Sequence, residues 1–203
     1  MEDALLVDAG TGNLRSVYNA LTSLGYAIRI TSDPAELGRG GRVILPGVGA
    51  FGNFMNGISR LGLAEAIQSA ANRGGPLLCI CVGMQALFEI GEELGQTPGL
   101  GLLPGRVVRF PEIAGVKVPH TGWNQVTSSR PTPLFKDLAP GSYVYFNHSY
   151  YCAPANLADA VATTEYGISF ASMVKHENCY GVQFHPEKSQ RVGLQMLRNF
   201  MEL

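Results

Sequence analysis

The N-terminal half of the chain alternates short apolar runs with segments of helical periodicity, a pattern typical of successive β-α-β units. The fourth apolar run, Leu77 to Ile80, has no polar residue at all. A strand that is apolar on both faces belongs in the centre of a parallel sheet, because helices cover both faces there. The sequence therefore predicts an α/β fold, with a mostly parallel sheet flanked by helices.

Turn signals divide this half into individual elements. Strands are expected at Ala4 to Val7, Ala27 to Ile30, Val43 to Leu45 and Leu77 to Ile80. Helices are expected from Asn13 to Leu24 (ended by Gly25), after the cap Asp33-Pro34, from Leu63 to Ala71 and from Met84 to Ile90. A tight turn is expected at Gly10-Thr11-Gly12.

The second half of the chain has a different texture. Residues 91–105 are rich in Gly and Pro and are predicted to form a loop. Added antiparallel strands are expected at Val107 to Phe110, Val116 to Val118, Tyr143 to Phe146 and Ser169 to Val174, then a late strand at Val182 to Phe184 and an amphipathic helix from Arg191. A length of 203 residues suits a single domain, 1–203.

Composition excludes several classes of function. The net charge is −1 and no run of Lys or Arg occurs, so binding to nucleic acid or to an anionic membrane is not expected. No stretch approaches the roughly 18 apolar residues of a membrane span, and the first residues lack a basic signal region, so a cytoplasmic location is expected. The thiols of Cys79, Cys81, Cys152 and Cys179 are expected to be free.

Cys81 follows the apolar strand directly and precedes Val82-Gly83 and a helical segment. This layout is that of a nucleophile elbow, in which a sharp turn presents a reactive side chain at the carboxyl end of a strand. The helix N-terminus favours the thiolate, and Gly83 leaves room for the turn. A buried packing cysteine is the alternative. No other Cys or His pair is close in sequence, so neither a metal site nor a cofactor is expected.

A cysteine nucleophile needs a base, and the base needs an acceptor that orients it. His185-Pro186-Glu187 offers both, because Pro186 favours an extended His185, and residues two apart in an extended segment point the same way. A structural histidine at a strand end is the alternative. His176 lies in a polar turn and is expected to be solvated, whereas His120 and His148 have no carboxylate two residues on.

Backbone N–H groups that could stabilise an oxyanion are expected at two strand ends. Pro46-Gly47-Val48-Gly49 ends the third strand with two glycines, so Gly47, Val48 and Gly49 are candidates together with the N–H of Val82. An ordinary strand-ending turn is the alternative for this segment.

Three segments together resemble the class I glutamine amidotransferases, which use a Cys-His-Glu triad. They are Pro46-Gly47-Val48-Gly49, Cys79-Ile80-Cys81-Val82-Gly83-Met84-Gln85 and Val182-Gln183-Phe184-His185-Pro186-Glu187. Four further segments are similar to the glutaminase subunits of imidazole glycerol phosphate synthases within that family: residues 8–14, Pro119 to Asn124, Tyr145 to Tyr150, and Lys188-Ser189.

The resemblance implies a function and a set of site residues. Cys81 would attack the carboxamide of L-glutamine, His185 would move protons and Glu187 would orient His185. Gln85, His148, Ser149 and Tyr150 match positions that bind glutamine in the family. The ammonia would pass to a (β/α)8-barrel cyclase subunit in a heterodimer that serves histidine biosynthesis.

Two positions depart from the family pattern. Cys79 stands where the family usually has Gly, and Ala9 where it often has Tyr.

The chain could instead be the glutaminase of anthranilate, aminodeoxychorismate or GMP synthase; a thiol hydrolase of γ-glutamyl peptides; or a scaffold without catalysis. Lys188-Ser189 and Pro119 to Asn124 favour the histidine pathway.

Overall fold

The computed structural model describes residues 3–11 and 13–203. Gly12, the last residue of the predicted turn at Gly10, lies outside the described residues. Among the described residues, twelve strands form one sheet, and two more form a separate antiparallel sheet. The larger sheet has the order β2-β1-β3-β4-β14-β13-β11-β7-β5-β6, with β12 and β9 branching from β13.

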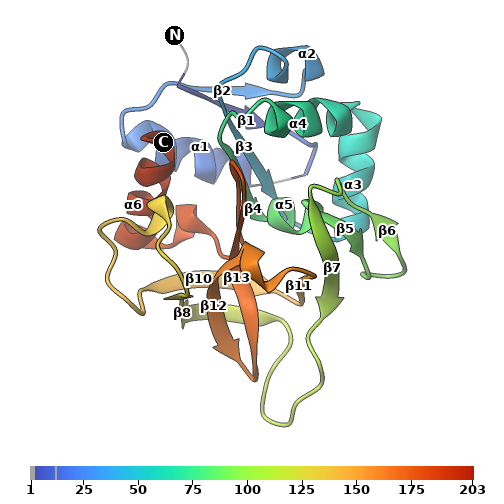
Figure 1. Ribbon diagram of the computed structural model, residues 1–203, viewed down its shortest axis with the longest axis vertical. Coiled ribbons are helices and arrows are strands. Elements are labelled where there is room, and N and C mark those ends of the chain that lie inside the picture. The colour runs from blue at the N-terminus through green and yellow to red at the C-terminus, as the bar shows by residue number, and fades with distance from the viewer. Residues whose placement is uncertain (1–2, 12) are drawn as a thin grey trace.

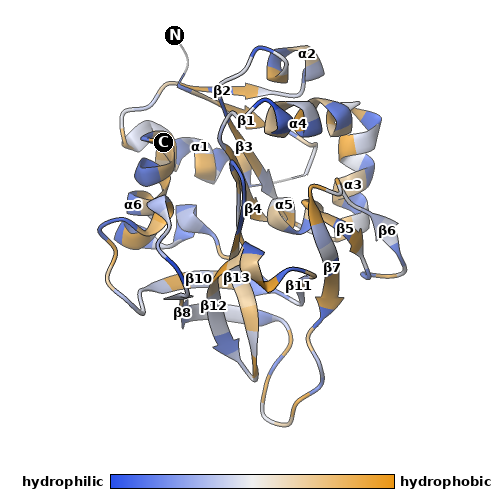
Figure 2. Cartoon of the chain, in the orientation of Figure 1, coloured by the Kyte–Doolittle hydropathy of each residue, from blue (hydrophilic) through white to orange (hydrophobic). Residues whose placement is uncertain are grey.

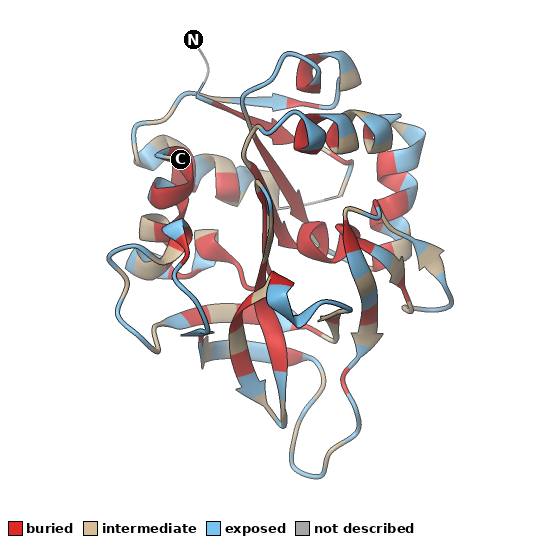
Figure 3. Ribbon diagram, viewed as in Figure 1, coloured by how far each residue is buried: buried red, intermediate tan, exposed pale blue. Residues whose placement is uncertain are grey.

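One half of the large sheet is parallel, as predicted, and its central strands are fully buried. Its members are β1 (Ala4–Val7), β2 (Ile28–Thr31), β3 (Arg42–Gly47), β4 (Leu77–Cys81) and β14 (Cys179–Val182). Every residue of β1 and β4 is buried, which is why these strands carry no polar side chain. Figure 3 shows this buried band running through the centre of the molecule.

Helices cover both faces of the parallel strands. They are α1 (Leu14–Ser23), α2 (Pro34–Leu37), α3 (Phe51–Arg60), α4 (Leu63–Asn72), α5 (Val82–Ala86) and α6 (Gln190–Met201). Figure 1 shows α1 and α6 on one side of these strands and α3 and α4 on the other. Hydrophilic residues gather on the outward faces of the helices, whereas the central strands are largely hydrophobic (Figure 2).

The other half of the large sheet is antiparallel except for the pair β5–β7. Its strands are β5 (Phe88–Gly91), β6 (Thr97–Pro98), β7 (Leu103–Arg109), β9 (Thr127–Ser128), β11 (Tyr150–Pro154), β12 (Ala160–Tyr166) and β13 (Ile168–His176). The second sheet pairs β8 (His120–Gln125) with β10 (Tyr143–His148). Short 3-10 turns are η1 (Pro133–Phe135), η2 (Leu157–Asp159) and η3 (Pro186–Lys188). The predicted fold class is confirmed.

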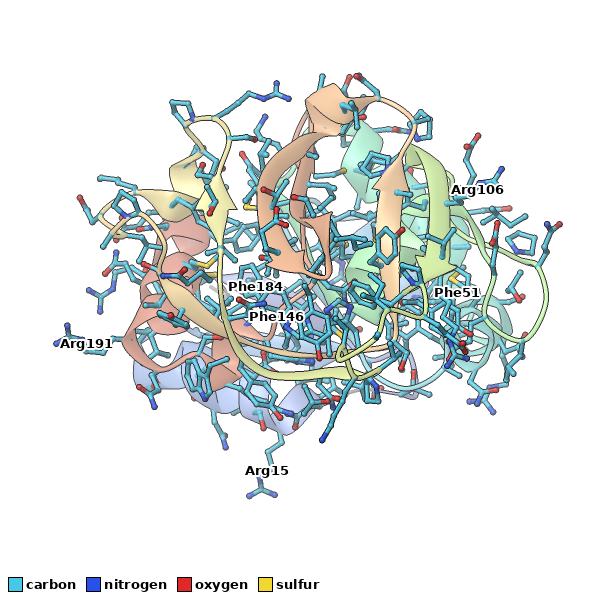
Figure 4. The ribbon with its side chains drawn as sticks, turned by 90° about the horizontal axis from the view of Figure 1, so that it is seen from below. Arg15, Phe51, Arg106, Phe146, Phe184 and Arg191 are labelled. Carbon is cyan, nitrogen blue, oxygen red and sulfur yellow. The ribbon has the colours of Figure 1, made fainter. Side chains whose placement is uncertain are left out.

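Aromatic side chains connect the second sheet to the parallel strands. Phe146 of β10 lies 5.7 Å, between ring centroids, from Phe184 beyond β14, and both rings are fully buried. Figure 4 shows both rings in the interior, whereas Arg15, Arg106 and Arg191 project outward. The second sheet is therefore anchored directly beside the end of the parallel sheet.

The structure corrects several predicted boundaries. The helix predicted from Met84 to Ile90 ends at Ala86, and Phe88 to Gly91 forms β5, which pairs with β7 and β6. A short apolar run is compatible with either a buried helix or a buried strand. Pairing with β6 and β7 made Phe88 to Gly91 a strand. Residues 91–105, predicted as a loop, contain β6 and the start of β7.

Two further predictions concern segments near Pro and Gly. Val116 to Val118 was expected to be a strand, but it lies in the loop between β7 and β8, after Gly115, whose φ is +84°. Val116 instead packs against Gly167. The late strand ends at Val182 rather than at Phe184. Helix α3 was not predicted, because its two glycines and two asparagines have low helix propensity and weaken the helical pattern.

Candidate active site

Cys81 is the last residue of β4, and α5 begins at the next residue. Its backbone has φ 57° and ψ −113°, a conformation that a residue with a side chain rarely adopts. Gly83 permits this turn, since a Cβ there would lie 2.1 Å from the carbonyl oxygen of Leu45. The elbow predicted from the sequence is therefore present, and its strain is held by a buried strand and a short helix.

His185 reaches Cys81 because β14 pairs in parallel with β4, with Val182 opposite Ile80. The segment that follows β14 therefore leaves the sheet beside the elbow. His185 is extended, with φ −103° and ψ 98°, as its position before Pro186 predicts. Its Nδ1 lies 2.9 Å from Oε1 of Glu187.

The route by which Glu187 reaches His185 differs from the prediction. An extended segment was expected, but Pro186 to Lys188 form the 3-10 turn η3. The turn folds Glu187 back toward His185, and the side chains of His185 and Glu187 are only 4% and 1% exposed. No described residue donates a hydrogen bond to the second oxygen, Oε2.

The electrostatics of this group favour a protonated histidine. Burial alone would lower the pKa of His185, but hydrogen bonds to Cys81 and Glu187 and the charges of these two groups outweigh it and raise the pKa to about 10. An imidazolium beside a sulfur stabilises a thiolate, which is the nucleophilic form of cysteine. The three side chains thus form a unit in which one imidazolium lies between two acidic groups, an arrangement suited to nucleophilic catalysis.

A cavity of about 430 Å³ opens over Cys81 and His185. Seven other residues singled out in the sequence lie in it or at its rim: Val48, Gly49, Val82, Gln85, His148, Ser149 and Tyr150. Gly49 has φ +90°, a conformation that glycine adopts without strain. The carboxyl ends of β3 and β4 and the junction between β10 and β11 therefore converge on one hollow.

Gly47 is the exception among the predicted residues. It belongs to β3, where it pairs with Cys81, and it is absent from the residues that line the cavity. A Cβ on Gly47 would lie 2.7 Å from the backbone nitrogen of Gly83 and 2.7 Å from Phe54. Glycine is therefore required at position 47 by close packing behind the elbow, and only Val48 and Gly49 of this segment lie at the cavity as candidate oxyanion donors.

Five other residues line the cavity but were not predicted from the sequence as site residues: Asn13, Glu93, Pro119, Asn147 and Lys188. Glu93 has the clearest contact, because its Oε2 accepts a hydrogen bond of 2.6 Å from the N–H of Phe51, at the start of α3. Asn13, Pro119, Asn147 and Lys188 belong to segments that resemble the family, which was the available signal. Glu93 lay in a region predicted as loop and carried no signal.

The remaining histidines have partners of their own. His120 and His148 are buried side by side, with Nδ1 of His120 3.0 Å from Nε2 of His148. Burial lowers the pKa of His120 to about 4 and, as the largest cause, that of His148 to about 3. His176 is solvated as expected, with its side chain 44% exposed, and its Nδ1 also lies 3.1 Å from Oδ1 of Asp159.

The described residues contain neither a disulfide between the four cysteines nor a metal site. All four thiols are free and buried, as predicted. Within the described part of the chain, no group of three His, Cys, Asp or Glu side chains could hold a metal ion. Nor does any helix in that part have the length and apolarity needed to cross a bilayer.

Comparison with known proteins agrees with this geometry. The family model described as glutamine amidotransferase class-I matches residues 5–203. The chain therefore belongs to the class I glutamine amidotransferase family, as the three segments around Cys81 predicted.

Its relatives narrow the comparison further. The chain is 51% identical to the imidazole glycerol phosphate synthase subunit HisH of Moorella thermoacetica, over 100% of this chain and 96% of the relative. It is 45% identical to the subunit of the same name from Syntrophotalea carbinolica, over 98% and 99%. The structure of PurLQS from Thermotoga maritima has a similar fold, with a TM-score of 0.74 at 19% identity, over 98% of this chain and 97% of that one.

Proposed function

We propose that this chain is the glutaminase subunit of an imidazole glycerol phosphate synthase, with Cys81 as nucleophile. The observation that carries the proposal is the buried Cys81–His185–Glu187 unit, of which Cys81 and His185 line the cavity. Full-length identity of 51% to a HisH subunit supports the choice within the family. The rival synthases and the free-standing hydrolase predicted as alternatives have no comparable support.

The reaction follows from the geometry. The Cys81 thiolate attacks the carboxamide carbon of L-glutamine, and charge develops on the carboxamide oxygen. The N–H of Val82, at the start of α5, and those of Val48 and Gly49 are the donors proposed for this oxyanion. His185 then gives its proton to the departing nitrogen, which leaves as ammonia, and a γ-glutamyl thioester remains on Sγ.

Hydrolysis of the thioester completes the cycle. His185, now neutral, takes a proton from water while the water oxygen attacks the thioester carbon. The C–S bond breaks, glutamate leaves, and the thiolate and the imidazolium are restored. Glu187 keeps the ring oriented through its contact with Nδ1, which leaves Nε2 free to face the reacting atoms.

Four residues are proposed to bind the substrate: Gln85, His148, Ser149 and Tyr150. All four line the cavity above Cys81. Gln85 is held in place by hydrogen bonds from its Nε2 to the Tyr150 carbonyl and to Gln183, each 3.1 Å long. A cavity of about 430 Å³ is ample for one amino acid and remains open for exchange of product.

The partner proposed for the chain is a (β/α)8-barrel cyclase subunit, which would receive the ammonia. Several features support docking at the cavity mouth. Pro119 and Lys188 line the cavity, and the Lys188 ammonium lies 5.7 Å from the ring centroid of Tyr145. The neighbouring Trp123 is 46% exposed, which is unusual for tryptophan and typical of interface aromatics.

The test measures product formation from L-glutamine with the purified chain and the cyclase subunit together. Glutamate and ammonia should appear in equal amounts, and Cys81→Ser should abolish both because serine is far less acidic than cysteine. Release of glutamate from γ-glutamyl peptides at a higher kcat/KM than from glutamine would instead establish the hydrolase.

A further inference from the structure

Gln183 is a fully buried polar residue that the mechanism above does not use. It follows β14 directly, and its backbone N–H donates a 2.9 Å hydrogen bond to the carbonyl of Ser172 on β13. Its Nε2 lies 3.7 Å from Sγ of Cys81, within hydrogen-bond range for sulfur. A buried amide beside a nucleophile needs a partner for each of its polar atoms.

The orientation of the Gln183 amide follows from its neighbours. The carbonyl of Tyr150 can only accept, so the group of Gln85 that lies 3.1 Å from it is the NH₂. The second hydrogen of that NH₂ points to the Gln183 side chain, at 3.1 Å, which must therefore present its Oε1. The NH₂ of Gln183 is left to face the sulfur of Cys81.

A pair of histidines anchors the same carbonyl from the other side. Nδ1 of His148 lies 2.8 Å from the Tyr150 carbonyl and must carry a hydrogen, so Nε2 of the neutral ring accepts. Nδ1 of His120 then donates to it over 3.0 Å. Nε2 of His120 accepts in turn from Nδ2 of Asn124, at 3.3 Å. Every donor in this network has its own acceptor, so its direction is fixed.

We propose that Gln183 is a further catalytic residue: a neutral hydrogen-bond donor that stabilises the Cys81 thiolate and aims its sulfur at the substrate. The inference rests on the proposed role of Cys81 as nucleophile. It gives the thiolate a second stabilising contact besides His185. The amide cannot rotate away, because its oxygen is held by Gln85 and, through Tyr150, by the histidine pair.

The test titrates the thiol directly, without the glutaminase reaction. The pH dependence of Cys81 alkylation by iodoacetamide is measured on the full chain by peptide mass mapping. The ionisable groups around Cys81 and its cavity, which stay the same in all variants, are His185, Glu187, Cys152, His148, Glu93, Lys188 and Tyr150.

Two substitutions separate the donor from the acceptor. Gln183→Met keeps the length of the side chain but removes both polar atoms. Gln183→Glu keeps an acceptor for Gln85 and replaces the donor to sulfur with a second acidic oxygen. Both should move the alkylation midpoint of Cys81 upward, by about one pH unit or more for the Glu variant. In assays with glutamine and the cyclase subunit, kcat for the Glu variant should fall about tenfold or more while KM changes less.

The matched controls are Gln68→Met and Gln68→Glu on α4, where Nε2 of Gln68 donates to the Leu100 carbonyl. These controls should leave the midpoint unchanged. A wild-type midpoint in folded Gln183→Met overturns the inference, whether or not Gln183→Glu folds. Loss of the proposed function would look different, because wild-type chain would then show no glutaminase activity while the midpoint shift at Gln183 could still be measured.

Discussion

At the scale of single residues, the site depends on Cys81 holding a backbone conformation that cysteine ordinarily avoids. Its φ of 57° persists because β4 is paired on both sides and α5 begins without a linking loop. The same geometry exposes its sulfur to the cavity, whereas Cys79 points into the core two residues earlier. Burial raises the pKa of Cys79 and of Cys152 well above the ordinary value.

This contrast gives a prediction about reactivity. A glutamine-like diazo-ketone should label Cys81 selectively among the four cysteines, because the burial that raises the pKa of Cys79, Cys152 and Cys179 suppresses their thiolates. Peptide mass mapping after partial inactivation is the measurement. Label found mainly on Cys152, or spread evenly, would contradict the assignment of the nucleophile.

The base and its orienting carboxylate should differ in importance. His185→Ala should lower glutamine hydrolysis nearly as far as Cys81→Ser, since the members of such a unit act together. Glu187→Gln should cost less, because an amide oxygen can still accept from Nδ1 of His185. Steady-state rates of all three variants with the cyclase subunit provide the comparison. Equal loss in Glu187→Gln and Cys81→Ser, with Glu187→Ala fully active, would show that Glu187 does not orient the base.

The buried pair His120–His148 predicts acid sensitivity. The pKa of His120 is about 4 and that of His148 about 3, both below the ordinary 6.5. As the pH falls below 6.5, the unfolded chain therefore binds protons at these two rings that the folded chain does not bind. The stability that these neutral rings contribute is complete above about pH 6.5 and is lost as the pH falls toward 4, by up to about 1.4 kcal/mol per pH unit for each ring.

Urea unfolding of wild type and His120→Gln at pH 7, 6 and 5 checks this expectation. The free energy of unfolding of the variant should fall less steeply with acid. His185 acts in the opposite direction, because its raised pKa of about 10 gives stability that is present below pH 6.5 and lost as the pH rises through 10. Identical slopes for wild type and variant between pH 7 and 5 would rule out a contribution from His120.

At the scale of elements, the glycines of α3 show how closely that helix approaches the segment that follows β1. A Cβ on Gly57 would lie 2.2 Å from the carbonyl oxygen of Ala9, whereas one on Gly52 in the same helix would meet only Thr97 Oγ1, at 3.6 Å. Helix α3 begins at Phe51, one residue after the Val48–Gly49 turn. The packing of α3 against the backbone at Ala9 therefore also positions that turn.

A matched pair of substitutions tests this packing. Gly57→Ala should destabilise the protein by about 1–3 kcal/mol, since the backbone of Ala9 must move. Gly52→Ala should be neutral or stabilising by up to about 0.5 kcal/mol, because alanine is the better helix former. Thermal unfolding of both variants, with glutaminase rates alongside, gives the answer. A Gly57→Ala variant as stable as wild type would mean that α3 does not need this close approach.

At the scale of the whole molecule, the active cavity opens at the edge where the parallel strands meet the second sheet. Its lining comes from several separate parts of the chain, between Asn13 and Lys188, and Gly49 lies within it with a φ of +90°, a conformation that glycine adopts without strain. We expect the isolated chain to be nearly idle, because a docked partner at the cavity mouth can turn an N–H near Gly49 toward the oxyanion.

The gating prediction is checked with three assays of glutamine hydrolysis. They use the chain alone, the chain with the cyclase subunit, and the complex with the ribulosyl substrate of the cyclase. The rate should rise at least about tenfold across the series, which corresponds to about 1.4 kcal/mol of barrier. A Gly49→Ala variant should show a smaller increase because its undocked rate is already raised, since the φ of +90° in the undocked chain is strained for alanine. Equal rates in the three assays would reject gating.

The sequence by itself determined the class of fold, the family and the elbow at Cys81. Each of these depends on local features: apolar runs such as Ala4 to Val7, caps such as Asp33, and the requirement for Gly83 behind the nucleophile. The family motifs also identified His185 and Glu187 in advance, although the roles of these residues stay predictions. Such features can be predicted from the sequence because they depend on residues that are close together along the chain.

Only the tertiary structure decided the rest. Phe88 to Gly91 became a strand because β7 and β6 offered pairing partners, and Glu187 reached His185 through a 3-10 turn rather than an extended segment. The contact of Gln183 with Cys81, and the pairing of His120 with His148, join residues 102 and 28 positions apart. Such contacts depend on the register between strands that are far apart in the sequence. The packing of the whole chain determines that register, so no local sequence pattern predicts it.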